Sequence, residues 1–233
     1  MAPLPLHIPE HTFILPYIYK ELGTRMDEIR NDIEIMVSSA NIYTTPHENS
    51  DENAAVDTAG KWVAMENDFI AKTEANNKTA IIIRCGEIIG TGMTGFPARL
   101  AKMIWRGTFF HFPDNETRIS VIHASDVARA VCKILLSGLP AGIPHTLNLT
   151  DAADPTIREL AEALAFRMNE KRISTLSTRP QQWIGKILYG KKLMKELSLT
   201  RTADSSLLRT AIGITPVPAC SYLREHVYDE SSL

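Results

Sequence analysis

The sequence has 233 residues, of which 44% are apolar and 22% are charged, and its formal net charge is −2. This length and apolar content suffice for one substantial hydrophobic core and exclude general disorder. The balanced charge, without long blocks of like charge, excludes a polybasic nucleic-acid-binding protein, so we expect no nucleic-acid partner.

The sequence also lacks the signals of a membrane or secreted protein. Its longest apolar runs, such as Ile81–Ile83 and Val131–Leu136, are far shorter than the roughly 20 residues of a membrane helix. The N-terminal segment has no basic region leading into an apolar one. Three widely spaced cysteines, Cys85, Cys132 and Cys220, fit neither a disulfide framework nor a zinc site. We therefore expect a cytoplasmic protein with no membrane partner and no metal site.

The first part of the chain predicts a helix, a strand and a loop in turn. Residues 13–30 mix apolar and charged side chains and are expected to form a helix. The apolar run Ile33–Val37 predicts a strand that Ser38 and Ser39 end. Residues 44–58 are polar, acidic and rich in turn formers, which indicates a loop.

A helix is predicted over Lys61–Ala75. Its two expected sides carry the apolar residues Val63, Phe69 and Ile70 and the carboxylates Glu66, Asp68 and Glu74. The β-branched run Thr79–Arg84 then predicts a buried strand. A short helix over Leu100–Trp105 is expected to end at Gly107.

Two well-marked helices follow, with a strand between them. After a predicted strand at 118–123, Ser125 is a suitable N-cap for a helix whose apolar residues recur at helical spacing up to Gly138. Residues 145–150 predict the intervening strand. The second helix is predicted to begin at Asp154.

This alternation of strands and helices favours an α/β fold with a largely parallel sheet. We expect a partial Rossmann-like parallel sheet with flanking helices in residues 1–150. A mostly helical C-terminal lobe, intertwined with that sheet, is expected in residues 151–233. We interpret the lysine-rich segment 185–197 in this lobe as a solvated helix face, in preference to a surface for an anionic ligand or a membrane.

One short segment raises the question of cofactor binding. Gly90, Gly92 and Gly95 have the G-x-G-x-x-G spacing of a dinucleotide-binding loop. Pro97 is expected to delay the start of the following helix beyond these glycines. The predicted strand also ends well before Gly90, unless it continues through Ile89. On the residues alone we favour a look-alike over a phosphate-binding loop.

The order of several segments suggests another interpretation of these glycines. VSSANIY, KWVAMEND, AIIIRCGEIIGTG, RISVIHASDVARAV and HTLNLTDAADPTIRELAEAL follow one another along the chain. In this order they resemble the C-terminal two-thirds of the extended short-chain dehydrogenase/reductases, the NAD-dependent epimerase/dehydratase family, over residues 3–218. The resemblance implies an NAD(P)-dependent oxidoreductase that uses NAD or NADP and acts on a nucleotide sugar or a related small molecule. It makes the glycine segment a loop at the rim of the nicotinamide and substrate pocket.

The resemblance also implies a set of site residues. Ser39 matches the catalytic serine of the family, although Ser38 and Ser39 can also be interpreted as a plain strand end. Cofactor-binding segments of the family fall on Ser38, Cys85, Gly86 and Glu87. Arg118 falls near the position of an arginine that contacts the substrate diphosphate, for which a guanidinium is well suited.

The catalytic tyrosine and lysine of the family are not matched. That tyrosine acts as general acid/base, and a lysine four residues later lowers its pKa, which is otherwise about 10. Counting back from Glu66 places Thr58 at the tyrosine position and Trp62 at the lysine position. Lys61 lies one position away and is the candidate catalytic lysine, provided that the helix register shifts. Glu87 stands where many epimerases of the family have asparagine.

Two functions therefore remain open. The glycine-rich half of the family precedes the resembling segment, so we expect an atypical or truncated NAD(P)-dependent enzyme. The alternative is a non-catalytic relic, a binding or structural module that has lost cofactor chemistry. In either case an incomplete parallel sheet exposes an apolar edge, which favours self-association of the chain as a homo-oligomer.

Overall fold

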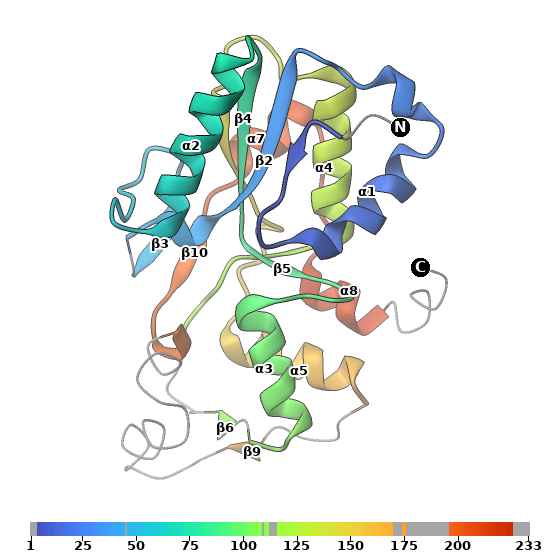
Figure 1. Ribbon diagram of the computed structural model, residues 1–233. Coiled ribbons are helices and arrows are strands. Elements are labelled where there is room, and N and C mark those ends of the chain that lie inside the picture. Colours follow the sequence, from blue (N-terminus) through green and yellow to red (C-terminus); the bar gives the residue numbers. More distant parts are fainter. Residues whose placement is uncertain are drawn as a thin grey trace.

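The computed structural model describes residues 4–44, 46–108, 110–111, 116–169, 174–175 and 196–225. Its centre is a four-stranded parallel sheet in the order β1-β2-β4-β8 (Figure 1). The strands are β1 (Leu6–His7), β2 (Ile33–Ser39), β4 (Thr79–Cys85) and β8 (Thr146–Leu149). The predicted α/β fold with a parallel sheet is confirmed.

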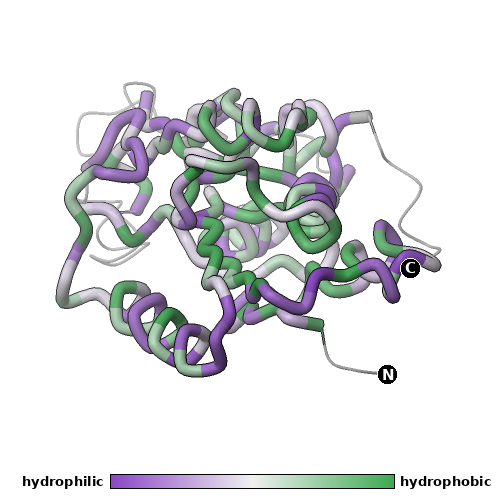
Figure 2. The backbone as a smooth tube through the Cα atoms, turned by 90° about the horizontal axis from the view of Figure 1, so that it is seen from above, coloured by the Kyte–Doolittle hydropathy of each residue, from purple (hydrophilic) through white to green (hydrophobic). Residues whose placement is uncertain are grey.

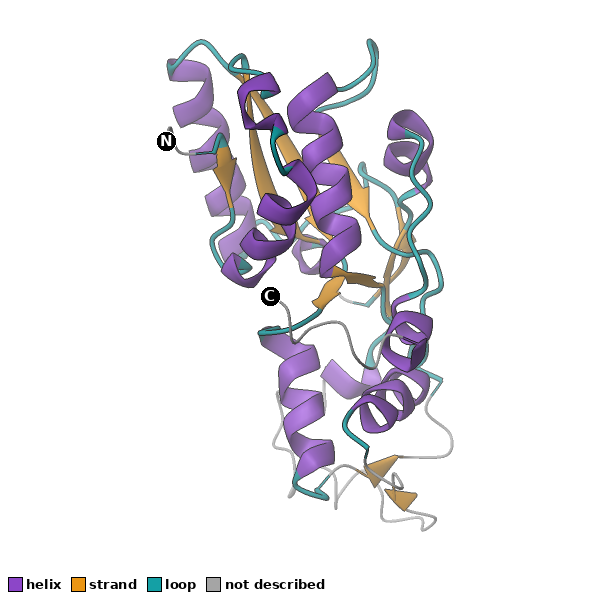
Figure 3. Cartoon of the chain, turned by 90° about the vertical axis from the view of Figure 1, so that its right-hand side faces the viewer, coloured by secondary structure: helices purple, strands orange, loops and turns teal. Residues whose placement is uncertain are grey.

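Helices cover both faces of this sheet (Figures 1 and 3). Helices α1 (Leu15–Leu22) and α4 (Ala124–Ser137) lie on one face, and α2 (Lys61–Ala75) lies on the other. Because successive strand residues point to opposite faces, Ile35 belongs to the core under α1 and α4, whereas Met36 belongs to the core under α2. Burial on both faces explains why β2 and β4 are continuously apolar.

A lobe lies beyond the carboxyl ends of the strands (Figure 3). In it α3 (Gly95–Trp105) packs against α5 (Ile157–Arg167), and α5 packs against α8 (Ala219–Glu225). Helix α7 (Ser206–Ile212) instead returns to the sheet and packs on β8. Elements from before and after the expected boundary at residue 150 thus pack together both in the lobe and on the central sheet. The boundary itself stays a prediction.

Outside the central sheet, the described residues form three two-stranded parallel pairs. They are β5 (Glu87–Ile89) with β7 (Val121–His123), β3 (His47–Ser50) with β10 (Arg201–Ala203), and β6 (Phe110–His111) with β9 (Ser174–Thr175). The expectation of a loop over residues 44–58 is wrong at β3. Its partner β10 lies far along the chain, so local composition carries no sign of the pairing.

The expectation of one helix over residues 13–30 is also wrong. The chain there forms the 3-10 helix η1 (Thr12–Ile14), then α1, then the 3-10 helix η2 (Arg25–Glu28). Gly23 has a φ of 53° and ends α1, because this left-handed backbone conformation suits glycine and breaks the helix. A third 3-10 helix, η3 (Ala40–Ile42), follows β2.

Helix α4 ends as predicted but begins differently. Its N-cap is His123, whose Nδ1 accepts a hydrogen bond from the Ser125 N–H at 3.2 Å, so Ser125 lies inside the helix. At the other end Gly138 has a φ of 72° and stops the helix.

Helix α5 begins after Thr156 and not at Asp154. The Thr156 hydroxyl accepts a hydrogen bond from the Glu159 N–H at 3.1 Å, and the Glu159 carboxylate accepts one from the Thr156 N–H at 2.7 Å. This reciprocal capping box satisfies two N–H groups that the helix cannot pair internally. The Thr156–Glu159 spacing is a recognisable capping-box signal, which our expectation of a start at Asp154 overlooked.

Helix α3 begins earlier than the expected Leu100. Pro97 lies in its first turn, where the missing N–H has no intrahelical acceptor to lose, so the helix starts at Gly95. The objection from Pro97 is therefore wrong. Strand β4 ends at Cys85 as expected, and the separate short strand β5 ends at Ile89, directly before Gly90. The contacts of the glycines decide their role.

Helix α2 has the predicted bounds, but Glu66 lies on its buried side. The Glu66 carboxylate accepts hydrogen bonds from the Arg84 guanidinium at 3.1 and 2.8 Å and from the Ser38 hydroxyl at 2.6 Å. Arg84 also contacts the Tyr43 hydroxyl at 3.4 Å, and Tyr43 donates to Asn148 Oδ1 at 2.6 Å. This buried network joins α2 to β2, β4 and β8.

Hydrophilic and hydrophobic segments alternate along the turns of the helices (Figure 2), which is typical of helices that pack one side on a core. Within the described residues, no helix is long and apolar enough to cross a membrane. The same residues contain no group of three or more His, Cys, Asp or Glu side chains placed to hold a metal ion.

Candidate functional site

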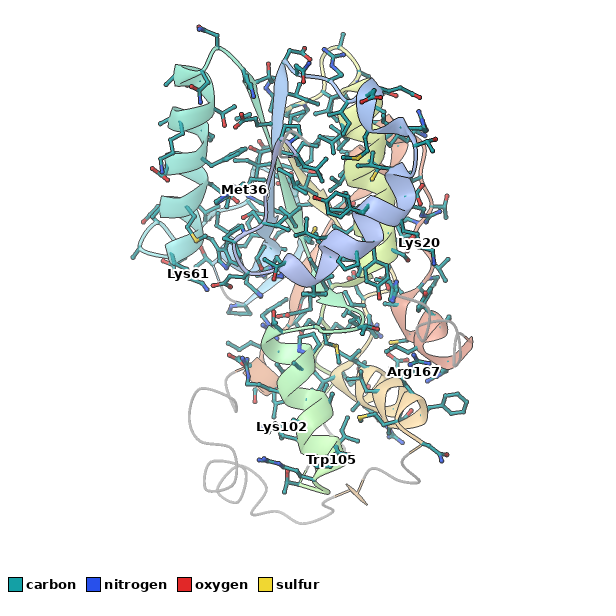
Figure 4. The ribbon with its side chains drawn as sticks, turned by 45° about the vertical axis from the view of Figure 1, so that its right-hand side comes forward. Lys20, Met36, Lys61, Lys102, Trp105 and Arg167 are labelled. Atoms are coloured by element: carbon teal, nitrogen blue, oxygen red, sulfur yellow. The ribbon has the colours of Figure 1, made fainter. Side chains whose placement is uncertain are left out.

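A cavity of about 750 Å³ lies between the sheet and the lobe. Ser39 and Gly86 line it at the carboxyl ends of β2 and β4, the edge at which parallel α/β sheets bind ligands. Figure 4 shows Lys61, in the first turn of α2, at the end of that helix nearest the lobe. Lys102 and Trp105 lie toward the C-terminal end of α3, away from the sheet.

Arg201, which our sequence analysis missed, makes several polar contacts in this cavity. Its Nη1 donates to Asn41 Oδ1 at 3.2 Å and lies 3.5 Å from Glu87 Oε1. Its Nη2 donates to the Glu196 carbonyl at 3.4 Å, and its guanidinium carbon lies 5.1 Å from the centre of the Phe96 ring. Burial raises the pKa of Glu87 although Arg201 opposes that shift. A permanently charged guanidinium, that of Arg201, therefore lies beside a carboxyl group of raised pKa, that of Glu87.

Two further ion pairs line the cavity. Arg99 pairs with Glu196, and Lys61 pairs with Glu10. Both pairs are partly exposed, so solvent screening leaves each a small contribution to stability. Lys61 and Arg99 therefore add two cationic side chains, besides Arg201, to the cavity wall.

The first turn of α3 also faces the cavity, through Thr94, Gly95 and Phe96. Thr94 holds the N-cap position, but its side chain makes no capping bond and its hydroxyl donates to the Glu10 carbonyl at 3.2 Å. The first N–H groups of α3 thus lack a side-chain cap, and a helix N-terminus in this state favours an anion.

The three glycines of this segment have different environments. A Cβ atom at Gly90 would lie 2.9 Å from the Ala124 side chain, so Gly90 serves the packing of the loop on α4. Gly92 and Gly95 have φ values of 77° and 70°, which glycine adopts without strain. Gly95 lines the cavity, as the family resemblance implies for this loop.

Among the described residues, three buried polar side-chain atoms have no hydrogen-bond partner: His11 Nδ1, His47 Nε2 and Arg201 Nε. All three side chains line this cavity. His11 stacks on Trp62, with ring centres 6.0 Å apart and planes at 10°. Burial lowers the pKa of both His11 and His47, so both rings are neutral near pH 7.

Four of the predicted site residues lie on this cavity: Ser39, Lys61, Gly86 and Glu87. The Ser39 hydroxyl accepts a hydrogen bond from the Asn41 N–H at 3.2 Å, which caps η3. Gly86 must be small for a packing reason, since a Cβ there would lie 2.7 Å from the Ser120 carbonyl oxygen.

The other three predicted residues do not line this cavity. Ser38 points to α2 and binds Glu66. Cys85 is 1% exposed in the core beneath α1 and α4, and burial raises the pKa of its thiol. Arg118 donates to the Asp154 carbonyl at 3.0 Å. Strand alternation explains Ser38 and Cys85, which point to opposite faces of the sheet from each other.

The tyrosine and lysine positions of the family hold residues unsuited to proton transfer. Thr58 is exposed and does not line the cavity. Trp62 is 8% exposed and packs on His11. No local signal could have found Arg201 or His47, because the backbone contact that places His47, from its ring to Thr202, spans 155 residues.

No protein-family model matches the sequence. No curated protein matches it either. Solved structures do match. One is an epimerase candidate from Burkholderia cenocepacia J2315, with 21% identity and a TM-score of 0.62 over 95% of this chain and 73% of that chain. A second is UDP-glucose 4-epimerase from Thermotoga maritima with UDP-glucose, with 13% identity and a TM-score of 0.60 over 95% and 75%.

A third is dTDP-glucose 4,6-dehydratase from Bacillus anthracis in complex with NAD, with 12% identity and a TM-score of 0.57 over 83% of this chain and 60% of that chain. The chain has the fold of the NAD-dependent epimerases and dehydratases. Its resemblance to the extended short-chain dehydrogenase/reductases is thereby confirmed at the level of the fold. The chain spans 60% to 75% of the lengths of these three structures.

Proposed function

We propose that this chain forms the substrate-side part of an NAD(P)-dependent oxidoreductase of the epimerase/dehydratase type, and that its cavity binds a nucleotide sugar or a similar phosphate-bearing small molecule. The observation that carries the proposal is the meeting of Arg201, with an unpaired buried Nε, and the uncapped start of α3 in one cavity at the carboxyl ends of the strands.

The anionic part of such a ligand would lie at the first turn of α3. The N–H groups there suit phosphate oxygens, and Arg201 and Arg99 add guanidinium donors that fit phosphate geometry. The Arg201 guanidinium lies over the Phe96 ring in a cation–π contact, and this contact limits the motion of the guanidinium. A sugar would then lie near Asn41 and Glu87, whose amide and carboxyl groups suit hydroxyl partners.

The residues fit the nicotinamide end of a cofactor in part. The Ser39 hydroxyl and the Lys61 amine both lie on the cavity wall, where they would hold a substrate oxygen and a ribose. A bound nicotinamide supplies hydride transfer, and the protein supplies position and electrostatics. Thr58 and Trp62 offer no tyrosine–lysine pair, so proton transfer would need another group of the cavity.

A second function, that of a non-catalytic binding module, is favoured by the stacked Trp62 and His11 at the former lysine position. This stack fills space where the family places a catalytic cation. A binding module would keep affinity for the phosphate-bearing ligand and lose affinity for the cofactor.

The test is a titration of the 233-residue chain with UDP-glucose by calorimetry and with NADH and NADPH by nicotinamide fluorescence. We expect saturable binding of UDP-glucose, weakened roughly 10- to 100-fold by Arg201→Gln, because a charge-assisted hydrogen-bond donor is lost. Arg118→Gln is the matched control and should bind as the wild type does. Binding of UDP-glucose without NADH or NADPH would favour the binding module, and no binding of any of the three would contradict both functions.

A further inference from the structure

A second, much smaller void adjoins the cavity. It measures about 10 Å³ and shares His47, Arg201, Asn41 and Glu87 with the lining of the main cavity. A void of about 10–15 Å³ holds one water-sized group. It therefore admits a single oxygen with its hydrogens and nothing larger.

The hydrogen bond of the His47 ring determines which nitrogen carries the proton. Nδ1 lies 3.0 Å from the Thr202 carbonyl oxygen, and since a carbonyl only accepts, Nδ1 is the donor. The neutral ring then presents a bare lone pair at Nε2. Burial lowers the pKa of His47 more than the bond to Thr202 raises it, so the ring is neutral near pH 7. Nε2 is thus a buried acceptor without a partner among the described residues.

Arg201 presents the complementary atom. Its Nη1 and Nη2 have acceptors in Asn41 and the Glu196 carbonyl, whereas its Nε–H has none among the described residues. The guanidinium is permanently charged, so this N–H is a donor at every pH at which the protein is folded. A buried donor and a buried acceptor, both unpaired, therefore belong to side chains that line the same one-oxygen void.

We propose that His47 Nε2 and Arg201 Nε form a subsite for one hydroxyl oxygen, which donates its hydrogen to His47 and accepts a hydrogen bond from Arg201. The occupant is a hydroxyl group of the small molecule in the main cavity or a single water. Only the first of these occupants rests on the proposed function. One oxygen in this subsite gives a hydrogen-bond partner to His47 Nε2 and to Arg201 Nε at once. The two side chains do not pair these atoms with each other.

The charges around His47 make this subsite sensitive to pH. Arg201 faces it from β10 and Glu87 from β5, while the Tyr43 ring lies edge-on with ring centres 5.4 Å apart. Protonation of His47 removes the acceptor and places a second positive charge beside Arg201. The hydrogen bond from the occupant to His47 is therefore made above the pKa of His47, which lies below the ordinary value of 6.5, and is lost as pH falls through it.

The test combines histidine-ring NMR with two substitutions at one position. His47→Gln keeps an acceptor that does not titrate, and His47→Leu removes it. His145, which is exposed, provides the control His145→Leu. We expect the wild-type ring signal that His47→Gln abolishes to show a proton on Nδ1, none on Nε2 at pH 7, and titration below pH 6.5.

Binding and melting measurements then distinguish the occupants. If a ligand hydroxyl fills the subsite, His47→Leu weakens UDP-glucose binding about tenfold, and His47→Gln restores most of it without the loss at low pH. If a water fills it, all variants bind UDP-glucose alike, and His47→Leu melts at a lower temperature than His47→Gln. Failure of the wild type to bind UDP-glucose contradicts the proposed function, while the ring signal and the melting temperatures still decide the subsite.

Two results would overturn the subsite. The first is a His47 ring that carries its proton on Nε2, or on both nitrogens, at pH 7. The second is equal binding of UDP-glucose and equal melting temperature for His47→Leu and His47→Gln. This result would mean that Nε2 accepts no hydrogen bond that contributes to binding or stability.

Discussion

Asp151 is a single carboxyl that ties the sheet to the lobe. It follows β8, and its Oδ2 accepts a hydrogen bond from the N–H of Ala219, the first residue of α8, at 2.6 Å. Its Oδ1 accepts one from the Ala153 N–H at 2.9 Å. Burial outweighs these bonds and raises the pKa of Asp151 from 3.8 to about 6. The side chain therefore binds a proton more readily in the folded chain than in the unfolded chain.

This raised pKa predicts a specific pH dependence of stability. Between pH 3.8 and about 6 the folded state holds the proton and the unfolded state has lost it, so the free energy of unfolding falls as pH rises through this window. Asp151→Asn does not titrate there. The free energy of unfolding of the wild type relative to this variant should fall by roughly 2–3 kcal/mol across the window and stay constant above it. Denaturant melts at a series of pH values measure the difference, and a difference that does not change with pH would refute the prediction.

Among the elements, α2 contacts the sheet through one buried ion pair besides its apolar core. Glu66 and Arg84 have side chains 5% and 10% exposed, and the carboxylate receives three hydrogen bonds in all, with Ser38 as the third donor. Such a pair need not add net stability over apolar residues of the same volume, but removing one partner leaves a buried charge. The network therefore specifies how α2 sits on β2 and β4.

We expect Glu66→Ala to lower the free energy of unfolding by about 3–5 kcal/mol, because Arg84 keeps its buried charge without a carboxylate partner. Glu74→Ala, on the exposed side of the same helix, should change it by less than about 0.5 kcal/mol. The double variant Glu66→Leu with Arg84→Met should regain most of the loss. Urea unfolding decides the matter: equal effects of Glu66→Ala and Glu74→Ala would show that the pair does not hold α2.

At the scale of the whole molecule, the central sheet ends on one side at β1. This strand has only two residues, and Leu6 pairs with Ile35 of β2. Within the described residues, no strand pairs with the other edge of β1. Leu4, Leu6 and Ile8 are only partly buried against the core along this edge. An apolar strand edge of this kind can pair with a second chain.

We therefore expect the purified chain to self-associate, with a sedimentation coefficient that rises with concentration. Leu4→Lys places a charge on the edge and should shift the chain toward the monomer, since charged edge strands resist pairing. Leu207→Lys, at an exposed apolar residue of α7, is the control and should leave self-association unchanged. A wild-type chain that sediments as a monomer at every concentration would exclude association through this edge.

Particular elements show how far sequence reasoning reached. The bounds of α2, the core of β2 and β4, and the Gly138 stop were predictable, because apolar spacing, β-branched runs and glycine act within a few residues. The start of α5 was equally local, in the Thr156–Glu159 capping box, and was misassigned. Of the site residues predicted through the order of motifs, Ser39, Lys61, Gly86 and Glu87 lie on the cavity, and their roles stay a prediction.

The sequence by itself determined the alternation of strands and helices, and hence the parallel α/β fold, because periodicity and chain order suffice to specify it. Only the tertiary structure decided that Glu66 is buried and that His47 and Arg201 line the same cavity. The reason is physical: the β3–β10 pairing joins residues far apart along the chain, and its energy comes from contacts that exist only after the core has formed.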